Sequence, residues 1–366
     1  MAELVVLSLE RWDDVWRRNQ YLVDGLLRAD PELRVLFVEP PDDPVHDMRS
    51  GRRPETGSRL TQIGDRLWRF RPVKWLPRRL DAQADARMAR AARRAAVRLG
   101  FIAPMLWIND PAATDLAEQT GWPVLYDMTD DWLAADRAPA ERERITRGET
   151  WLLQHASAVV ACSPELVRRK ESQRADIALV RNGVDTARYR MPMPRPADLP
   201  PGSYALYVGT LHRDRIDVEL VEQTARALDG VGRLVLVGPE AWSPTDAARV
   251  RAAGAVVLGA RARDLIPGYL QHASVLTVPH LVTEFTESLD PIKLYEYQAV
   301  GRPIVSTPVA GFRDAADVHV AEADAYVAAV AASMTGASQG VGLTLNAESL
   351  DWSQRVSEFR DALTRL

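Results

Sequence analysis

Short apolar runs alternate with segments of helical spacing along the first half of the chain. The runs that predict buried strands cover residues 4–9, 34–38, 105–108, 124–126, 158–161 and 177–180. Helical spacing covers residues 14–28 and 78–99, and the stretch from residue 40 to about residue 77 has the composition of loops. Strands that alternate with helices in this way predict a mainly parallel sheet with helices on both faces.

A second alternating series follows a proline-rich segment. Its expected strands are residues 204–208, 234–237, 256–258, 274–278 and 304–306, and its expected helices are residues 218–228 and 291–300. Residues 191–202 hold five prolines, which lack an amide donor and stiffen the chain, so they predict a linker. We therefore expect a first domain at 1–190, a linker at 191–203, a second domain at 204–350 and a C-terminal helix at 351–366 that packs back on the first domain.

Length and composition fit two globular domains. The chain has 366 residues, 46% hydrophobic and 26% charged, and no apolar run approaches the roughly 20 residues that a membrane span needs. Cys162 is the one cysteine, which excludes an internal disulfide or a thiolate metal cluster. The first ten residues lack a basic n-region and predict a strand rather than a signal peptide. These features predict a cytoplasmic protein.

Basic residues concentrate in one region. Residues 49–98 hold fifteen arginines or lysines against four acidic residues, a net charge of +11, whereas the whole chain carries −4. Within this region, residues 67–80 (LWRFRPVKWLPRRL) interleave basic and aromatic side chains. Three explanations remain open: peripheral docking on an anionic membrane, an anionic acceptor, and a solvated face near the site.

Residues 284–308 (EFTESLDPIKLYEYQAVGRPIVSTP) combine residue types that bind a nucleoside diphosphate. Asp290 is expected to cap a helix whose first position is Pro291. The amides and partial positive charge of a helix N-terminus suit phosphate groups, and Lys293 in the first turn would reinforce them. Glu296, one turn further, is placed to accept hydrogen bonds from a ribose diol.

This segment resembles the signature of retaining GT-B glycosyltransferases of the large family 4 type, or glycosyltransferase group 1. In that signature an acidic residue is followed, after seven residues, by a second glutamate and then by Ala-x-Gly-x-Pro-Val-Val. Glu296 matches the second glutamate, and residues 299–305 (AVGRPIV) match the tail. The variant Pro-x-Lys-x-x-Glu-Tyr resembles a subgroup that includes teichuronic acid-type transferases. The resemblance implies two Rossmann-like domains whose parallel sheets face each other across a cleft.

The chain departs from the signature at its first acidic position. Ser288 stands there, and Glu284 or Glu287 could replace the missing carboxylate from the same loop. The role of Lys293 also has an alternative, since a salt bridge to Glu287 or Glu296 would merely steady the loop.

The resemblance extends to the start of the second domain. Residues 207–211 (YVGTL) resemble the first strand and loop of the donor domain. Arg215 lies near the position of a phosphate-binding lysine, with Arg213 as the alternative. The donor-binding residues that the resemblance implies are Gly209, Arg213, Gly238, Arg261, Glu287, Ser288, Ile292 and Glu296, and the catalytic cations are Lys293 and Arg215.

Three carboxylates follow a buried strand of the first domain. Asp127, Asp130 and Asp131 lie in a Tyr-Asp-x-x-Asp-Asp pattern that also occurs in the resembled subgroup. We expect Asp127 and Asp130 to act in catalysis and Asp131 to contact the acceptor, because ligands bind at the carboxyl ends of strands. The alternative is a loop that caps the next helix. Trp12 and Asp13, after the first strand, are further acceptor-side candidates unless the ring simply packs.

The resemblance implies transfer of a hexosyl group from a UDP, GDP or dTDP sugar to an acceptor hydroxyl, as in bacterial polysaccharide or natural-product glycosylation. Retention at the anomeric carbon is implied, and neither a metal nor a nucleic-acid partner is expected. A sugar-nucleotide 2-epimerase of the same fold and a non-catalytic nucleotide-sugar-binding homologue remain open. The sequence holds no HExxH, GxSxG, P-loop or GxGxxG motif, which argues against hydrolases, NTPases and dehydrogenases. His280, at a strand end, is expected to be structural.

Overall fold

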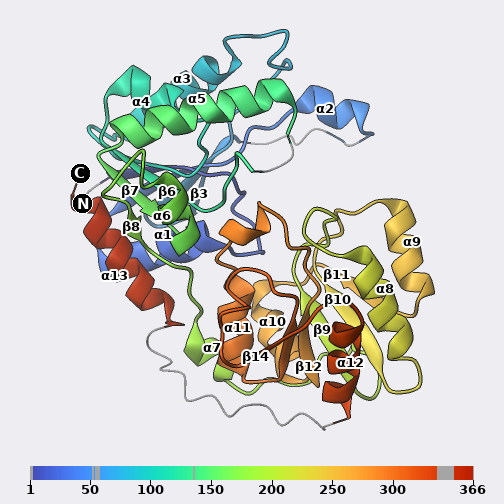
Figure 1. Ribbon diagram of the computed structural model, residues 1–366. Helices are drawn as coiled ribbons and strands as arrows, with labels where there is room; N and C mark the ends of the chain where they lie inside the picture. The colour runs from blue at the N-terminus through green and yellow to red at the C-terminus, as the bar shows by residue number, and fades with distance from the viewer. Residues whose placement is uncertain (1–2, 52, 54–57, 135–136, 336–349, 366) are drawn as a thin grey trace. The chain divides into compact units, whose positions relative to one another are not determined.

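The chain folds into two compact units in a computed structural model that describes residues 3–51, 53, 58–134, 137–335 and 350–365 (Figure 1). The first unit comprises the chain up to Arg181 together with Arg355–Leu366, and the second comprises Asn182–Gln354. Each unit is built on one sheet, and the strands of both sheets are almost all parallel. The predicted α/β class is therefore confirmed.

The sheet of the first unit has the strand order β3-β4-β2-β1-β5-β6-β7-β8. Its strands are β1 (Glu3–Leu7), β2 (Arg34–Val38), β3 (Leu60–Gly64), β4 (Leu67–Phe70), β5 (Met105–Ile108), β6 (Val124–Met128), β7 (Ala158–Ala161) and β8 (Ala178–Leu179). Neighbouring strands pair in parallel except β3 and β4, which are antiparallel at one edge. The apolar run of β1 is buried because this strand lies between β2 and β5.

The first helix, α1 (Arg18–Ala29), begins later than the helix predicted at 14–28. The side chain of Gln20 accepts a hydrogen bond from the amide of Arg17, which closes the helix N-terminus at that point. Upstream, the amide of Trp12 donates to Glu39 at 2.8 Å and holds the chain on a different path. The apolar spacing predicted the helix, and the polar contacts decide where it starts.

The stretch predicted as loops holds elements that its pattern did not reveal. It contains α2 (Pro44–Arg49) and the β3–β4 hairpin, and the helix expected at 78–99 is the shorter α3 (Ala84–Arg98). β4 joins the sheet because Leu67 and Phe70 are buried in the core, whereas the two residues between them are half-buried. A strand this short does not stand out from loop composition.

The C-terminal helix completes the first unit. The remaining helices are α4 (Asp115–Thr120), α5 (Pro139–His155), α6 (Pro164–Lys170) and α13 (Trp352–Leu363). α13 lies beside α1 (Figure 1), and the ring centroid of Phe359 is 4.5 Å from that of Trp107. Gly25 of α1 leaves room for α13, since a Cβ at this position would lie 2.2 Å from Cγ2 of Val356 on α13.

The second unit has six parallel strands in the order β11-β10-β9-β12-β13-β14. They are β9 (Tyr204–Val208), β10 (Arg233–Val237), β11 (Val256–Gly259), β12 (Val275–Val278), β13 (Ile304–Ser306) and β14 (Val318–Val320). Its helices are α7 (Thr186–Arg190), α8 (Val218–Ala227), α9 (Pro244–Ala252), α10 (Ile266–Gln271), α11 (Ile292–Val300), α12 (Ala323–Met334) and the 3₁₀ helices η1 (Arg263–Leu265) and η2 (Thr286–Ser288). The order reverses between β9 and β12.

The division between the units lies before the proline-rich segment. Asn182 already belongs to the second unit, and its amide donates to Asp290 at 2.6 Å. The segment expected as a linker at 191–203 packs on the second unit, where the amide of Met193 donates to Gln271 at 2.9 Å. Proline content indicated a stiff segment, but contacts with distant residues decide to which unit it belongs.

Candidate functional site

The predicted phosphate-binding helix starts at the point where the strand order of the second sheet reverses. Ligands of open α/β sheets bind at such a point, beyond the carboxyl ends of the strands. α11 begins at Ile292, has Pro291 as its N-cap and ends at Gly301 in the left-handed conformation. Ile292 and Lys293 therefore occupy the first turn, as the sequence predicted.

The N-cap role predicted for Asp290 is wrong. No side chain caps α11. The carboxylate of Asp290 instead accepts hydrogen bonds from the amide of Asn182 at 2.6 Å and from the hydroxyl of Tyr295 at 2.7 Å. A partner far away in the sequence thus outcompetes the local cap, and the carboxylate joins the entry of the second unit to the motif helix.

Lys293 extends from α11 toward β9 and the end of β12. Its Nζ donates to the hydroxyl of Tyr207 at 2.8 Å, lies 3.3 Å from Nε2 of His280 and lies 4.2 Å from the centre of the Tyr207 ring. The Tyr207 hydroxyl and His280 Nε2 are 3.0 Å apart. Lys293 forms no salt bridge with any described residue, so the alternative of a pair with Glu287 or Glu296 does not hold in this structure.

Burial and neighbouring charge alter the proton affinity of these three groups. Burial, reinforced by Arg215 and opposed by Glu296, lowers the pKa of Lys293 to about 7. Burial, Lys293 and Arg215 hold the pKa of His280 well below its ordinary value, so the ring is neutral near pH 7. Burial raises the pKa of Tyr207, so its hydroxyl stays protonated.

Two glycines at strand ends allow close packing in this region, and Gly209 leaves the space beside Lys293 open. Gly209 has φ of +150°, and a Cβ there would lie 2.7 Å from Nζ of Lys293 and 2.9 Å from the Tyr207 hydroxyl. Gly238 has φ of +152°, and a Cβ there would lie 2.0 Å from the carbonyl oxygen of Gly209. Both positions therefore require glycine for conformation and for space.

Arg215, rather than Arg213, is the second cation near Lys293. The Arg215 guanidinium acts on the proton affinity of Lys293 and lies 5.1 Å from the ring centre of Phe285, in the motif loop. Arg213 is 59% exposed and pairs with Asp246 at 2.6 Å. Of the two alternatives that the sequence left open, the structure favours Arg215.

Glu296 is held by a residue that the sequence did not indicate. The hydroxyl of Tyr189, on α7, donates to Oε1 of Glu296 across 107 residues of sequence. Burial raises the pKa of Glu296, and this hydrogen bond and Lys293 oppose the rise. Tyr189 lies on a short helix outside every motif, so no local pattern could have connected it with the carboxylate.

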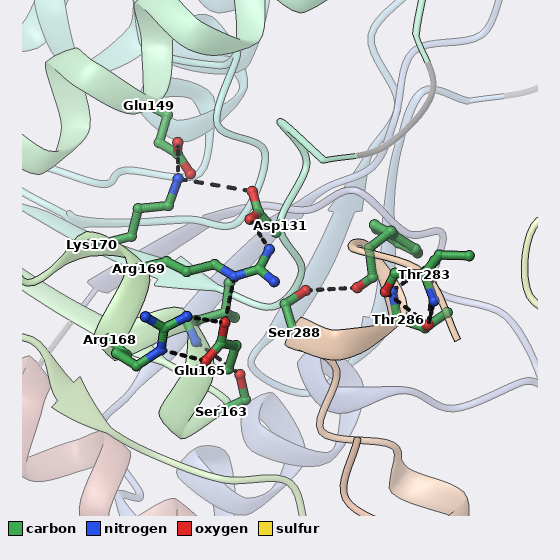
Figure 2. A network of polar contacts seen from close by, with 12 residues as sticks. Asp131, Glu149, Ser163, Glu165, Arg168, Arg169, Lys170, Thr283, Thr286 and Ser288 are labelled. Atoms are coloured by element: carbon green, nitrogen blue, oxygen red, sulfur yellow. Dashed lines mark hydrogen bonds and ion pairs between the residues drawn. The ribbon is translucent and has the colours of Figure 1, made fainter. Parts of the chain in front are cut away.

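Three other residues predicted to bind the donor form hydrogen bonds or ion pairs within the protein. Ser288 is buried, and its hydroxyl donates to a backbone carbonyl of its own turn at 2.8 Å (Figure 2). Glu287 pairs with Arg313 at 2.6 Å, and Arg261 pairs with Asp198 at 2.6 Å. Their roles in donor binding stay predictions.

Asp127 lies in the core of the first unit. It is fully buried, its two oxygens are 3.2 and 3.1 Å from Nε of Arg18, and Nε1 of Trp107 donates to it at 3.2 Å. Arg18 is 4% exposed and also donates to the carbonyl of Arg181. This environment argues against the catalytic role predicted for Asp127, because a carboxylate enclosed in this way cannot reach a substrate.

Asp131 belongs to a network of charges in the first unit (Figure 2). Arg169 donates to it at 2.7 Å, and Nζ of Lys170 lies 3.9 Å from it and 2.7 Å from Glu149. Asp130 is half-buried and lies 3.5 Å from the hydroxyl of the preceding threonine. No group of three or more His, Cys, Asp or Glu side chains among the described residues is arranged to hold a metal ion.

The two candidates after β1 differ in their surroundings. Trp12 packs edge-on against Phe37 and Trp16, with ring centroids 5.1 and 5.9 Å apart. Asp13 is exposed and accepts a hydrogen bond from the amide of Val15 at 2.9 Å. The packing alternative therefore describes Trp12, and an acceptor contact through Asp13 stays a prediction.

A pocket of the first unit lies at the carboxyl ends of β1 and β2. Leu7 and Val38 end these strands, and the polar groups of the pocket include Ser8, Asp110 and Arg144. Burial raises the pKa of Asp110. The sequence did not indicate these residues, because they come from separate loops and helices and form no motif.

Comparison with known proteins finds a family match within the second unit. Residues 202–336 match the family described as glycosyl transferases group 1. The teichuronic acid biosynthesis glycosyltransferase TuaH of Bacillus subtilis (strain 168) is 21% identical over 218 residues, which cover 55% of this chain and 55% of that protein. The chain thus spans about half the length of the curated relative that it matches.

Solved structures share the whole fold. A sucrose-phosphate synthase from Thermosynechococcus elongatus has a TM-score of 0.73 and 17% identity over 100% of this chain and 99% of its own. HepE of Anabaena has a TM-score of 0.66 and 13% identity over 100% of both chains, and the lipopolysaccharide galactosyltransferase WaaB has 0.60 and 14% over 99% of both. The expected resemblance is confirmed: the chain has the GT-B fold, and its residues 202–336 match the glycosyl transferases group 1 family.

Proposed function

We propose that this protein transfers a hexosyl group from a nucleoside diphosphate sugar to an acceptor hydroxyl. The observation that carries the proposal is the amine of Lys293, in the first turn of α11 and near Arg215, at the switch point of the second sheet. A helix N-terminus and two cationic side chains suit a diphosphate. The group 1 match at residues 202–336 includes this whole region.

In the proposed reaction the leaving diphosphate is stabilised electrostatically. Negative charge grows on it as its bond to the anomeric carbon breaks, and Lys293, Arg215 and the first amides of α11 are placed to meet that charge. Glu296 accepts the ribose hydroxyls one turn further along the helix. Retention, with the leaving phosphate assisting on the same face, and independence of a metal are parts of this proposal that rest on the family resemblance.

A UDP sugar is the donor to test first. HepE of Anabaena was solved in complex with UDP, and a trehalose-6-phosphate protein of E. coli was solved with UDP-2-fluoro glucose. By analogy, we infer a UDP donor for this chain, with GDP and dTDP sugars next. For the acceptor we propose the pocket that contains Asp110 and Arg144, because it lies where open α/β sheets bind ligands.

Donor binding by Glu296→Ala tests the proposal. We expect calorimetry with UDP to show a loss of about 1–3 kcal/mol relative to wild type, because a buried diol loses its charged partner. Glu219→Ala, which removes an exposed glutamate of the same unit, is the matched control and should bind like wild type. If Glu296→Ala binds each of UDP, GDP and dTDP as tightly as wild type does, Glu296 does not bind the ribose of the donor.

The position of Ser288 supports a second candidate, a non-catalytic nucleotide-sugar-binding homologue. Its hydroxyl is already bound within its own turn, where the family signature has a carboxylate. Tight donor binding without turnover on any acceptor would support this candidate. Conversion of the donor in the absence of acceptor would instead support a 2-epimerase.

We also infer that the basic region at residues 49–98 faces an anionic membrane surface. On α3, Arg90, Arg94 and Arg98 are exposed and form no ion pair or hydrogen bond with a described residue. Trp75 and Leu80 precede this helix and are 60% and 67% exposed. Exposed apolar side chains and exposed cations in one region of the chain fit a lipid interface better than a solvated face. Residues 52 and 54–57 of the region lie outside the described residues.

A further inference from the structure

The groups within hydrogen-bond distance of the Lys293 amine carry no negative charge. Its hydrogen-bond partner is the hydroxyl of Tyr207 at 2.8 Å, and Nε2 of His280 is 3.3 Å away. The hydroxyl of Tyr207 is itself 3.0 Å from Nε2 of His280. These three side chains come from α11, from β9 and from the residues that follow β12, so the fold of the second unit brings them together.

The protonation states of Lys293, Tyr207 and His280 determine which of these groups donates and which accepts each hydrogen bond. His280 is neutral near pH 7 because its pKa is well below the ordinary value, so Nε2 can accept a hydrogen bond. Tyr207 keeps its proton and donates it toward that nitrogen, which leaves the oxygen lone pairs for Lys293. The hydroxyl and the imidazole therefore orient the amine without neutralising it.

The charged groups that act on the amine are one cation, Arg215, and one carboxylate, Glu296. Arg215 lies on the loop after β9 and Glu296 lies on α11, where it is bound by Tyr189. Asp214 acts on Tyr207 from the same loop as Arg215. Burial disfavours the positive charge on Lys293, Arg215 adds to this effect, and Glu296 offsets it only in part, so the pKa of the amine is lowered to about 7.

We propose that Tyr207 and His280 are positioning residues for Lys293, and that the Lys293 amine takes up one proton from solvent when a nucleoside diphosphate sugar binds. The inference rests on the proposed function, because it needs the diphosphate beside Nζ. The proton passes from solvent to Nζ, and no bond within the donor breaks in this step. Two phosphate charges near the buried amine favour its protonated form.

The sign of the pH effect follows from this step. Below pH 7 the amine already carries its proton, so the donor binds without uptake. Above pH 7 each molecule must gain a proton on binding, so donor affinity falls by up to roughly tenfold for each pH unit. The uptake is expected to be about 0.1 proton at pH 6 and about 0.9 proton at pH 8.

Calorimetry with UDP-glucose tests the proposal. Its diphosphate is a diester whose charge does not change between pH 6 and 8, so the probe itself contributes no proton. Binding heats measured at pH 8 in Tris and in HEPES, buffers with different heats of ionisation, give the number of protons taken up. Lys293→Arg, which keeps the cation but cannot lose its proton in this range, should bind with no uptake and with no fall in affinity between pH 7 and 8.

Tyr207→Phe separates a positioning role from a merely structural one. Loss of the hydroxyl removes an acceptor from the ammonium, so the midpoint of proton uptake should move to lower pH. Tyr204→Phe is the matched control, because it removes a buried hydroxyl from the same strand that donates to the carbonyl of Tyr269 instead. The single change His280→Gln keeps an acceptor for Tyr207 and should retain the wild-type midpoint of proton uptake. The single change His280→Leu removes that acceptor and should shift the midpoint.

The outcomes distinguish this inference from the proposed function. Binding of UDP-glucose with equal heats in both buffers at pH 8 overturns the inference and leaves the proposed function standing. Identical midpoints in wild type, Tyr207→Phe and Tyr204→Phe overturn the positioning role. If UDP-glucose and the GDP and dTDP sugars all fail to bind, both the inference and the proposed function fail.

Discussion

At the scale of single residues, the three lysines of the chain have different surroundings. Lys74 pairs with Asp43 at 2.7 Å, and Lys170 pairs with Glu149 at 2.7 Å. Lys293 faces a hydroxyl and a neutral imidazole instead. In a chain with 43 arginines, a lysine at this point supplies a compact ammonium that can change its protonation, which a guanidinium cannot do.

Replacement of Lys293 should affect the chemical step more than donor binding. Lys293→Ala is expected to lower kcat more than it raises the donor KM, because the ammonium interaction strengthens as charge develops on the leaving diphosphate. Lys293→Arg should restore part of the rate. Steady-state kinetics with varied donor measure both constants, and Lys74→Ala is the control for loss of a paired lysine. A wild-type kcat per folded Lys293→Ala molecule would end the catalytic assignment.

The pair of Asp127 and Arg18 should matter for stability rather than for turnover. Asp127→Asn leaves a buried guanidinium without its counter-charge, so we expect unfolding in urea to need about 3–5 kcal/mol less free energy. Asp13→Asn changes an exposed carboxylate and should stay within about 0.5 kcal/mol of wild type. Activity per folded molecule of Asp127→Asn near the wild-type value supports the structural role, and a loss at unchanged stability contradicts it.

At the scale of elements, contacts between segments far apart in sequence place the helices. α13 packs beside α1 although more than three hundred residues separate them (Figure 1). α11 starts without a side-chain cap, and Asp290, just before it, binds Asn182 instead. Helix positions in both units therefore depend on single residues that leave room for, or bind to, a distant segment.

The contact between α1 and α13 should respond to the size of residue 25. Alanine stabilises a helix interior by about 1 kcal/mol over glycine, but a Cβ at Gly25 would lie 2.2 Å from Cγ2 of Val356. Overpacking costs about 1–3 kcal/mol, so Gly25→Ala should lower the free energy of unfolding. Gly25→Ala with Val356→Ala should be more stable than the sum of the single changes predicts. Strict additivity in this cycle would show that the two helices do not press on each other here.

At the scale of the whole molecule, charge is segregated. Residues 49–98 carry +11 in a chain of −4, and three exposed arginines of α3, Arg90, Arg94 and Arg98, have no described partner. A face of one sign attracts an anionic surface over about 10 Å at 0.1 M salt. No described helix is long and apolar enough to cross a bilayer.

Vesicle binding should depend on this basic face. The triple change Arg90→Gln, Arg94→Gln and Arg98→Gln should weaken binding to vesicles with anionic lipid at least tenfold, at about 1 kcal/mol for each arginine. A triple change of Arg226, Arg233 and Arg251 to Gln removes the same charge from exposed positions of the second unit and serves as the control. Sedimentation with anionic and neutral vesicles at two salt concentrations measures the effect. Equal binding of both triple variants would exclude α3 as the docking face.

The sequence by itself determined the central strands of both sheets, the α/β class and the place of Lys293 and Glu296 on one helix, because these depend on residues close together in the chain. Short apolar runs become central strands wherever they are folded, and spacing fixes a position within a helix. Only the tertiary structure decided which neighbours each side chain meets. It placed Arg215 rather than Arg213 near Lys293, enclosed Asp127 with Arg18, and brought Tyr189 to Glu296 across 107 residues. Burial and pairing of charge are properties of the folded contacts, and no local pattern encodes them.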